Sequence, residues 1–409
     1  MMRPEDRLPG PIRNALGRWQ LRHLGRSFWV FLFASCLFTF GVFVFVLLYN
    51  LYLLDRGFRE DFLGFVSSVM TVGNIVGTFL IVAVHRRLGL RGCLLCCFAS
   101  MAVVSAIRAL VLGKPALLGF AFVGGMVFSL WAISIPVILA QLTTVEMRQV
   151  GFSAYLATVI GIGIVADAVG GRLPGWLAVV GSPFESKRAA LLVGSGIAAL
   201  AIWPASRLRF DDAARPVRVS YPHGPFITRF VIPLFLLNLG TGAFNPFANT
   251  YFAQYLKMPV RTIGLVFSAG QLAQVVAISL APMIIRRLGQ VKGIMAIEIF
   301  TGASLAFLAT SPPDAAAALG FAGYLAFQWM DEPAMEGLLM TQVQPGERSG
   351  ASSLMYMVIF SANAIAAPLA GNGLSRFGYP AVIVAASCLL LLGGFLFGFL
   401  LRGFDPTRQ

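Results

Sequence analysis

The sequence predicts an all-α, polytopic membrane protein with twelve transmembrane helices in two pseudo-symmetric six-helix bundles. Hydrophobic residues make up 58% of the 409 residues and charged residues only 12%, with a mean hydropathy of +0.81. These values lie outside the range of soluble domains. The apolar residues gather in runs of roughly 20, the length of a helix that crosses a bilayer. The stretch Arg86-Arg87-Leu88-Gly89 recurs 200 residues later as Arg286-Arg287-Leu288-Gly289, so one half of the chain resembles the other.

Twelve segments meet the length requirement, six on each side of a polar stretch. In the first half we expect spans at 27–52, 62–84, 92–112, 116–141, 151–171 and 188–206. In the second half we expect them at 227–254, 262–285, 291–310, 315–341, 350–374 and 380–401. The predicted domains are an N-terminal bundle over 27–206, a cytoplasmic linker over 207–226 and a C-terminal bundle over 227–402. No other stretch is long and polar enough for a soluble catalytic domain, so we expect no enzyme.

Positive charge predicts the orientation, because Lys and Arg are enriched in cytoplasmic loops. With both termini in the cytoplasm, 21 of the 31 Lys and Arg fall on that side. Residues 1–26 place Ile12, Leu16 and Trp19 at helical spacing among arginines, which predicts an amphipathic segment on the lipid surface. Residues 403–409 are the expected cytoplasmic tail. We therefore expect a cell-membrane protein, in the inner membrane if bacterial. Its net charge of +14 is spread over loops, so no nucleic-acid partner is expected.

The first half contains two ionisable residues inside apolar runs. Asp167 lies in span five among four glycines that favour close helix packing. A carboxylate inside the bilayer is costly and is therefore a candidate functional group. We expect Asp167 to bind substrate or a proton, with Arg172 as a salt-bridge partner. Arg108 in span three is expected to extend to the outer surface.

Span seven has a polar face and a break. Its polar residues follow spacings of three and four, and Pro246 interrupts the helix. Asn245 and Asn249 are candidates for hydrogen bonds to substrate, although Asn245 could instead satisfy the backbone freed by Pro246. Asn50 takes the place in span one that Asn249 takes in span seven, and both are expected to cap or hinge their helices.

Span ten contains the strongest candidate site, because it combines three acids with a helix-breaking proline. It runs Gln328-Trp329-Met330-Asp331-Glu332-Pro333-Ala334-Met335-Glu336, and Pro333 favours a kink. Burial and like-charged neighbours favour the neutral form of a carboxyl, so one of these acids could exchange a proton for substrate. The candidate substrate or proton-binding residues are Gln328, Trp329, Asp331, Glu332 and Glu336. Alternatively, Glu336 is hydrated near the cytoplasm and Asp331 pairs with a loop arginine.

Glu298 in span nine is the weaker candidate, because Lys292 is near.

The twelve spans, the central linker and the loop after span two resemble the major facilitator superfamily. That family's loop has the pattern Gly-x-x-x-Asp-Arg-x-Gly-Arg-Arg, which Arg87, Gly89 and Arg91 match, while Arg86 replaces the acidic residue. In the family this acid helps to close the cytoplasmic face. The resemblance implies alternating access, a working monomer and a place at the bundle periphery for span nine with Glu298. It also implies conformational gating by Arg86, Arg87, Gly89, Arg286, Arg287 and Gly289, with Glu146, Arg148, Glu347 and Arg348 as possible replacement ion pairs.

The function we expect is proton-coupled secondary transport of a small amphiphilic or drug-like organic solute, with efflux slightly favoured. The carboxylates outnumber buried basic groups and aromatic residues are abundant, so the substrate is expected to be apolar or aromatic and cationic. A lipid or lysolipid carrier, a metabolite uptake symporter and a non-transporting sensor remain alternatives. No cofactor beyond the proton gradient is expected. Cys93, Cys96, Cys97 and His85 do not make a convincing metal site.

Overall fold

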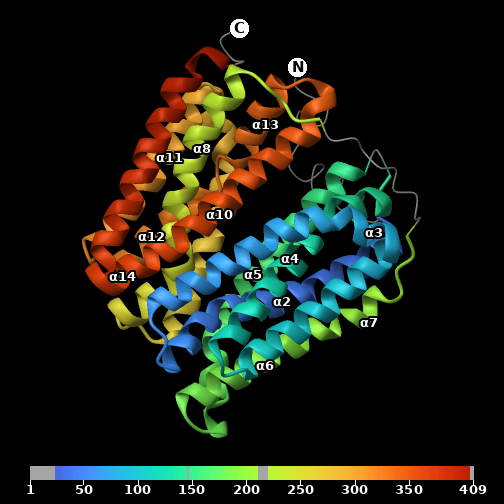
Figure 1. Cartoon of the computed structure of the whole chain (residues 1–409), viewed down its shortest axis with the longest axis vertical. Coiled ribbons are helices and arrows are strands. Elements are labelled where there is room, and N and C mark those ends of the chain that lie inside the picture. Colours follow the sequence, from blue (N-terminus) through green and yellow to red (C-terminus); the bar gives the residue numbers. More distant parts are fainter. Residues whose placement is uncertain (1–23, 145–146, 211–219, 406–409) are drawn as a thin grey trace, which may run out of the picture.

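The computed structural model describes residues 24–144, 147–210 and 220–405. Residues 1–23 of the predicted amphipathic segment, Glu146, most of the linker and the end of the tail lie outside these residues. Throughout the described part the regular elements are helical, as the sequence predicts. Figure 1 shows two groups of helices, one from each half of the chain, that lie side by side.

The first half forms six spans. α2 covers Arg26–Asp55, α4 covers Lys114–Leu142, α5 covers Arg148–Trp176, and α6 covers Pro183–Leu200 and is followed by the short α7, Ile202–Ala205. α3, Glu60–Leu110, is 51 residues long and turns at Gly89, whose φ is 65°. That dihedral is in the left-handed region that favours glycine, so Gly89 divides α3 into spans two and three.

The second half repeats this plan with two interruptions. α10 covers Val260–Leu288, α11 covers Gln290–Ala309, and Gly289 between them has a φ of 87°. Gly289 is therefore the structural equivalent of Gly89. α14, Arg348–Leu401, is 54 residues long and turns at Gly378. Spans seven and ten are the interrupted ones.

Span seven is broken where the sequence predicts. α8, Pro225–Phe244, is followed by a 3-10 turn, Asn245–Phe247, by the short α9, Ala248–Thr250, and by a π-helical turn, Tyr251–Tyr255. Pro246 causes the break because it lacks a backbone N–H and its ring displaces the preceding turn.

Span ten is broken as well. α12, Asp314–Gln328, ends four residues before α13, Glu332–Gln342, begins. Pro333 lies in the first turn of α13, where its missing N–H costs nothing.

Ten segments of the described chain are long and apolar enough to cross a membrane. One of them, Gly350–Phe404, is 55 residues long and has room for two spans. α12 and α13 lie in the remaining predicted span, and each is too short to cross by itself. The protein is therefore a multi-pass membrane protein, and its helices are consistent with twelve crossings.

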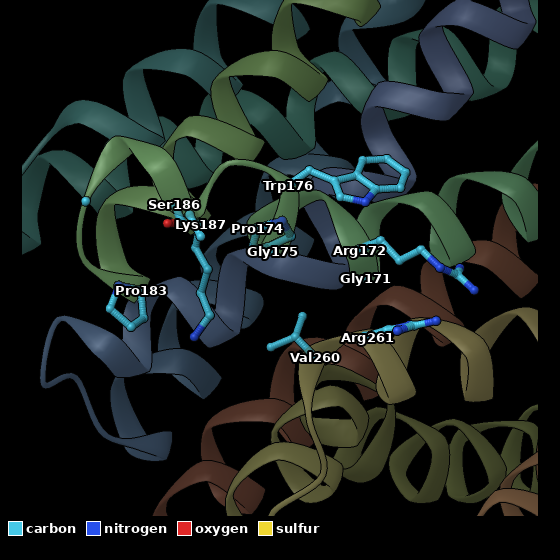
Figure 2. A pocket seen from close by; sticks show the side chains of 12 residues that line it. Gly171, Arg172, Pro174, Gly175, Trp176, Pro183, Ser186, Lys187, Val260 and Arg261 are labelled. Atoms are coloured by element: carbon cyan, nitrogen blue, oxygen red, sulfur yellow. The ribbon is translucent and has the colours of Figure 1, made fainter.

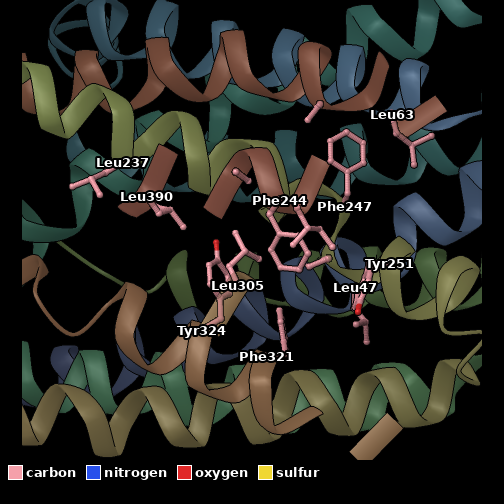
Figure 3. Close-up of a cluster of buried hydrophobic side chains, with 14 of the residues drawn as sticks. Leu47, Leu63, Leu237, Phe244, Phe247, Tyr251, Leu305, Phe321, Tyr324 and Leu390 are labelled. Atoms are coloured by element: carbon pink, nitrogen blue, oxygen red, sulfur yellow. The ribbon is translucent and has the colours of Figure 1, made fainter. Parts of the chain in front are cut away.

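A large apolar core joins elements of both halves. Figure 3 shows Leu47 and Leu63 of the first half near Phe247 and Tyr251 of the second. The core includes three fully buried tyrosines, and two of these make equivalent bonds in the two halves. The Tyr52 hydroxyl donates to the Ala109 carbonyl at 2.6 Å, and the Tyr251 hydroxyl donates to the Leu308 carbonyl at 2.8 Å. The duplication seen in the sequence is thus repeated in individual hydrogen bonds.

Contacts between the halves gather at one end of the molecule. We call the end where α2 finishes and α3 and α10 begin the far face, and the opposite end the near face. Close to the far face, Asn50 donates to the Pro246 carbonyl at 2.6 Å and Asn249 donates to the Leu47 carbonyl at 2.8 Å. A shift of 199 residues relates Asn50 to Asn249 and Leu47 to Pro246, so the two bonds are equivalent and form a reciprocal pair. Neither asparagine makes the predicted cap of its own helix, since each side chain bonds to the other half, while a hinge role stays a prediction.

A second reciprocal set lies beside the first. The Ser68 hydroxyl donates to the Ala364 carbonyl at 2.6 Å, and the Ser268 hydroxyl donates to the Ile164 carbonyl at 2.8 Å. Gly64 faces the Ala367 carbonyl, and a Cβ there would overlap that oxygen. We call these contacts, together with the asparagine pair and the equivalent glycine contact described next, the seal.

Gly264 makes the equivalent glycine contact in the other half of the seal. A Cβ at this position would overlap the carbonyl oxygen of Asp167. α3 therefore meets α14, and α5 meets α10, at a spacing that only glycine permits.

An alanine at Gly64 is expected to open the seal. Overpacking costs about 1–3 kcal/mol, which corresponds to a roughly 5- to 150-fold shift toward separated halves. The measurement is the distance between spin labels on Leu112→Cys and Phe377→Cys, two exposed far-face positions in different halves, after the five native cysteines have been replaced.

Gly161→Ala is the matched control, because Gly161 has open space where a Cβ would lie. Equal distance distributions for Gly64→Ala and Gly161→Ala would contradict the close-packing interpretation.

Candidate functional site

A cavity of about 300 Å³ lies inside the C-terminal half, between α8, α11, the α12–α13 break and α14. Polar residues from all four elements line it, and none of its described lining residues is Lys, Arg or His. The polar lining residues are Asn238, Thr241, Asn245, Glu298, Gln328, Asp331, Glu332, Tyr356 and Asn363. The site is therefore acidic, without a basic side chain to neutralise it.

Glu298 and Asp331 are the most buried acids that line this cavity. Glu298 is 6% exposed and Asp331 is 2% exposed, and their carboxyls lie within hydrogen-bonding reach of each other. Two carboxyls can hydrogen bond only when one of them carries a proton. The pair can therefore hold one proton between its two carboxyls.

This arrangement corrects two predictions. Glu298 is buried in the cavity and does not lie at the periphery beside Lys292. Asp331 faces Glu298, and no loop arginine pairs with it in the described structure.

The break in span ten positions Asp331. α12 ends at Gln328, and Asp331 is the residue before the first turn of α13, where its carbonyl accepts the Met335 N–H at 2.8 Å. The break leaves polar atoms without partners: Oδ2 of Asp331 and Oε1 of Gln328 are buried and accept no hydrogen bond. Buried polar atoms of this kind are costly, and they point to a ligand or a proton that completes the site.

Most of the other residues predicted in span ten also line the cavity. Glu332 is half-buried and lines the cavity with Gln328 and Trp329. Glu336 is also half-buried but lies outside the lining, where it is close enough to Tyr356 for a side-chain hydrogen bond. The structure thus gathers Gln328, Trp329, Asp331 and Glu332 at one cavity and leaves Glu336 beside it.

Span seven contributes one of its two predicted residues. The Asn245 side chain lines the cavity and its Oδ1 accepts a hydrogen bond of 2.7 Å from Tyr324, which is fully buried. Asn249 belongs to the seal and not to the cavity lining. The broken helix therefore places one asparagine at the site and the other at the interface between the halves.

At the equivalent place in the described N-terminal half, aromatic rings fill the space between the helices. The spacing of 200 residues pairs Glu298 with Phe98 and Asp331 with Trp131. Both aromatic rings pack on Phe38, with ring centroids 4.6 Å and 4.9 Å from it. Carboxyl groups thus occupy the positions in the second half that aromatic rings occupy in the first. The repeat could have drawn attention to Glu298, because it replaces a large apolar residue with an acid.

Asp167 lies away from the cavity, in the seal. It is 3% exposed and accepts a hydrogen bond from the Gln271 side chain of α10. Arg172 does not pair with it, since Nη1 of Arg172 donates to the Ala168 carbonyl at 2.7 Å. The predicted salt bridge is wrong because Arg172 lies near the end of α5, facing an open hollow.

That hollow has a volume of about 710 Å³ and lies at the far face between α5, α6 and α10. Figure 2 shows Arg172 and Arg261 on opposite sides of it, with Lys187 nearby. Lys187 is already paired with Asp55, with Nζ 2.6 Å from Oδ2. The hollow therefore lies beside the seal, at the far-face ends of α5 and α10.

Arg108 also differs from its prediction. It is 5% exposed, and its guanidinium lies 4.1 Å from the centre of the Tyr49 ring and 5.0 Å from that of Phe45. The aromatic faces hold the charge inside the first half, so Arg108 does not extend to the surface.

Among the described residues, no ion pair joins the predicted gating residues. Arg86, Arg87, Arg286 and Arg287 lie at the near-face ends of their helices and are half-buried or exposed. Arg148 reaches the Ala140 carbonyl, and among described residues the recorded ion pair is Lys187 with Asp55. Since the contacts between the halves gather at the far face, this conformation leaves the near-face arginines apart.

Residues 230–409 match the family model described as Major Facilitator Superfamily. No curated protein matches the sequence.

Several solved structures share the fold. The nucleoside transporter NupG superposes with a TM-score of 0.77 at 16% identity, covering 92% of this chain and 100% of its own. The inward-open xylose transporter XylE from E. coli gives 0.71 at 15% identity, covering 90% and 94%. A bacterial homologue of the lysosomal transporter Spinster, inward-facing and unoccupied, gives 0.70 at 12% identity, covering 92% and 97%. The resemblance to the major facilitator superfamily is thereby confirmed, in sequence for the C-terminal half and in fold for the whole chain.

Neutral variants of the carboxyl pair are expected to leave the fold intact. For Glu298→Gln and Asp331→Asn we expect unfolding free energies that are unchanged or up to about 2 kcal/mol higher, because residues at functional sites are rarely optimal for stability. Thermal unfolding of the purified protein measures this.

Trp131→Ala, at the position equivalent to Asp331, is the contrasting variant. It removes a packed ring and should lose about 3–5 kcal/mol. If the neutral variants lost as much, the carboxyls would be structural and the site interpretation would be wrong.

Proposed function

Because the chain has the major facilitator fold, we propose that it is a proton-coupled secondary transporter of a small amphiphilic or drug-like organic solute. The observation that supports this most directly is the Glu298–Asp331 pair with Glu332 in one buried cavity that has no basic lining residue. Ionisable groups inside a membrane protein are costly and mark substrate or ion pathways. An acidic cavity with Trp329, Tyr356 and Phe360 in its wall suits an organic cation with an apolar body.

The transport cycle that we propose is an exchange at the carboxyls. A proton held between Glu298 and Asp331 leaves when a cationic solute binds, because the two compete for the same negative charge. The halves then rock against each other, which exposes the cavity to the other side, and a proton replaces the solute there. The protein acts as a monomer and catalyses no chemical reaction.

The near face is cytoplasmic in this proposal, in agreement with the distribution of Lys and Arg. The conformation described above is sealed at the far face, so the cavity exchanges with the cytoplasm. Protons outside a bacterial cell are usually more concentrated than inside, and a proton-for-solute exchange would therefore expel the solute. Efflux is the direction that follows.

Proteoliposomes test the coupling. A pH-sensitive dye inside the vesicles reports proton movement as organic cations, organic anions, sugars and lysolipids are added in turn. We expect one cationic class to trigger proton flux, and Glu298→Gln, Asp331→Asn or Glu332→Gln to reduce this flux at least about tenfold, the factor that corresponds to 1.4 kcal/mol.

Asp314→Asn is the matched control. Asp314 is an exposed acid in the first turn of α12, the first part of span ten, and its substitution should leave the flux unchanged. Solute movement without protons in wild type would favour a uniporter or a lipid carrier. Tight ligand binding with no flux would favour a sensor.

A further inference from the structure

We infer that Asp167 is a second proton-binding site, built into the seal and emptied toward the far face when the halves separate. The inference builds on the proposed function, in that it adds a site to the same transport cycle. It starts from a polar difference between the two symmetric sides of the seal.

The seal is symmetric at the level of single residues. A shift of 200 residues relates Gly64 to Gly264, Ser68 to Ser268 and Ala364 to Ile164, each with its partner. The same shift relates Asp167 to Ala367 and Gln271 to Thr71. One side of the seal therefore holds a carboxyl and an amide where the other side holds a methyl group and a threonine.

The packing around this pair accommodates it closely. Gln271 is 8% exposed and its amide donates to Oδ2 of Asp167. A Cβ at position 163 would overlap the Gln271 side-chain oxygen, so the glycine of α5 leaves the space that the amide needs. The pair bridges α5 and α10, which belong to different halves, and it is buried only while these helices are together.

No opposite charge neutralises the carboxyl. Asp167 interacts with Gln271, and no charged or titratable side chain of the surrounding helices contributes to its environment. The charged residues of these helices are at their ends: Arg26 and Asp55 on α2, Lys114 on α4, Arg148 and Arg172 on α5, Glu185, Lys187 and Arg188 on α6, and Arg261, Arg286 and Arg287 on α10. Several of those at the far face surround the open hollow next to the seal.

Burial and exposure of Asp167 are thus coupled to the movement of the halves. An ionised carboxylate with one amide donor is costly when water is excluded, whereas a protonated carboxyl is tolerated there. When α5 and α10 separate, water from the far face reaches Asp167 and the ionised form becomes the favoured one. The sealed state therefore holds one proton more than the open state, so acid favours the sealed state and alkali favours the open state.

The test measures the open-to-sealed ratio against pH in lipid nanodiscs without substrate. Spin labels on Leu112→Cys and Phe377→Cys report the far-face distance. For a single proton the ratio is expected to rise with pH by up to about tenfold per unit. Asp167→Asn should abolish this dependence and stay sealed.

Two further variants separate the explanations. Ser68→Ala removes a seal hydrogen bond without touching a titratable group, so it should shift the ratio at every pH and keep the slope. The double variant Asp167→Ala with Gln271→Thr copies the residues of the symmetric position, and it replaces Asp167→Asn if that protein does not fold.

Two results would overturn the inference: a pH slope that Asp167→Asn leaves unchanged, or one that Glu298→Gln or Asp331→Asn removes instead. The distances need no solute, so the result is independent of the flux assay. A pH-dependent seal in a protein without flux would count against the transport proposal and leave the Asp167 site standing.

Discussion

Close approach of backbones at the far face is the constraint on which the rest of the structure depends. Gly64 and Gly264 bring α3 against α14 and α5 against α10 so closely that a methyl group would overlap a carbonyl oxygen. The reciprocal bonds of Asn50, Asn249, Ser68 and Ser268 form only at that spacing. The hydrogen bonds recorded between the halves among the described residues lie at this far face, and the cavity of the second half lies on the near side of the seal.

The duplicated architecture is filled differently in its two halves. Packed rings occupy the centre of the first, through Phe38, Phe98 and Trp131. Carboxyls occupy the same place in the second, where smaller polar side chains leave a cavity. The rings pack the centre of the first half, while the acids of the second half form a site whose cost in stability the surrounding core offsets.

The cavity and the seal are connected through span seven. Asn245 lines the cavity and accepts the Tyr324 hydroxyl, and the next residue, Pro246, offers its carbonyl to Asn50 across the seal. The irregular backbone of Asn245–Phe247 therefore touches both places. Such breaks are where a small local change can be passed to the packing between two bodies. The sequence marks this position only by its proline.

The sequence by itself determined the class, the helices and the repeat, because hydropathy and glycine or proline positions act locally along the chain. It also located the acids of span ten and the break at Pro333. Only the tertiary structure decided which polar groups meet. Glu298 joins Asp331, Asp167 bonds Gln271 and not Arg172, and Arg108 lies over Tyr49, because helices far apart in sequence present these side chains to one another. Periodicity within one helix carries no information about the register of its neighbour. The conformation, which is sealed at the far face, also depends on that register.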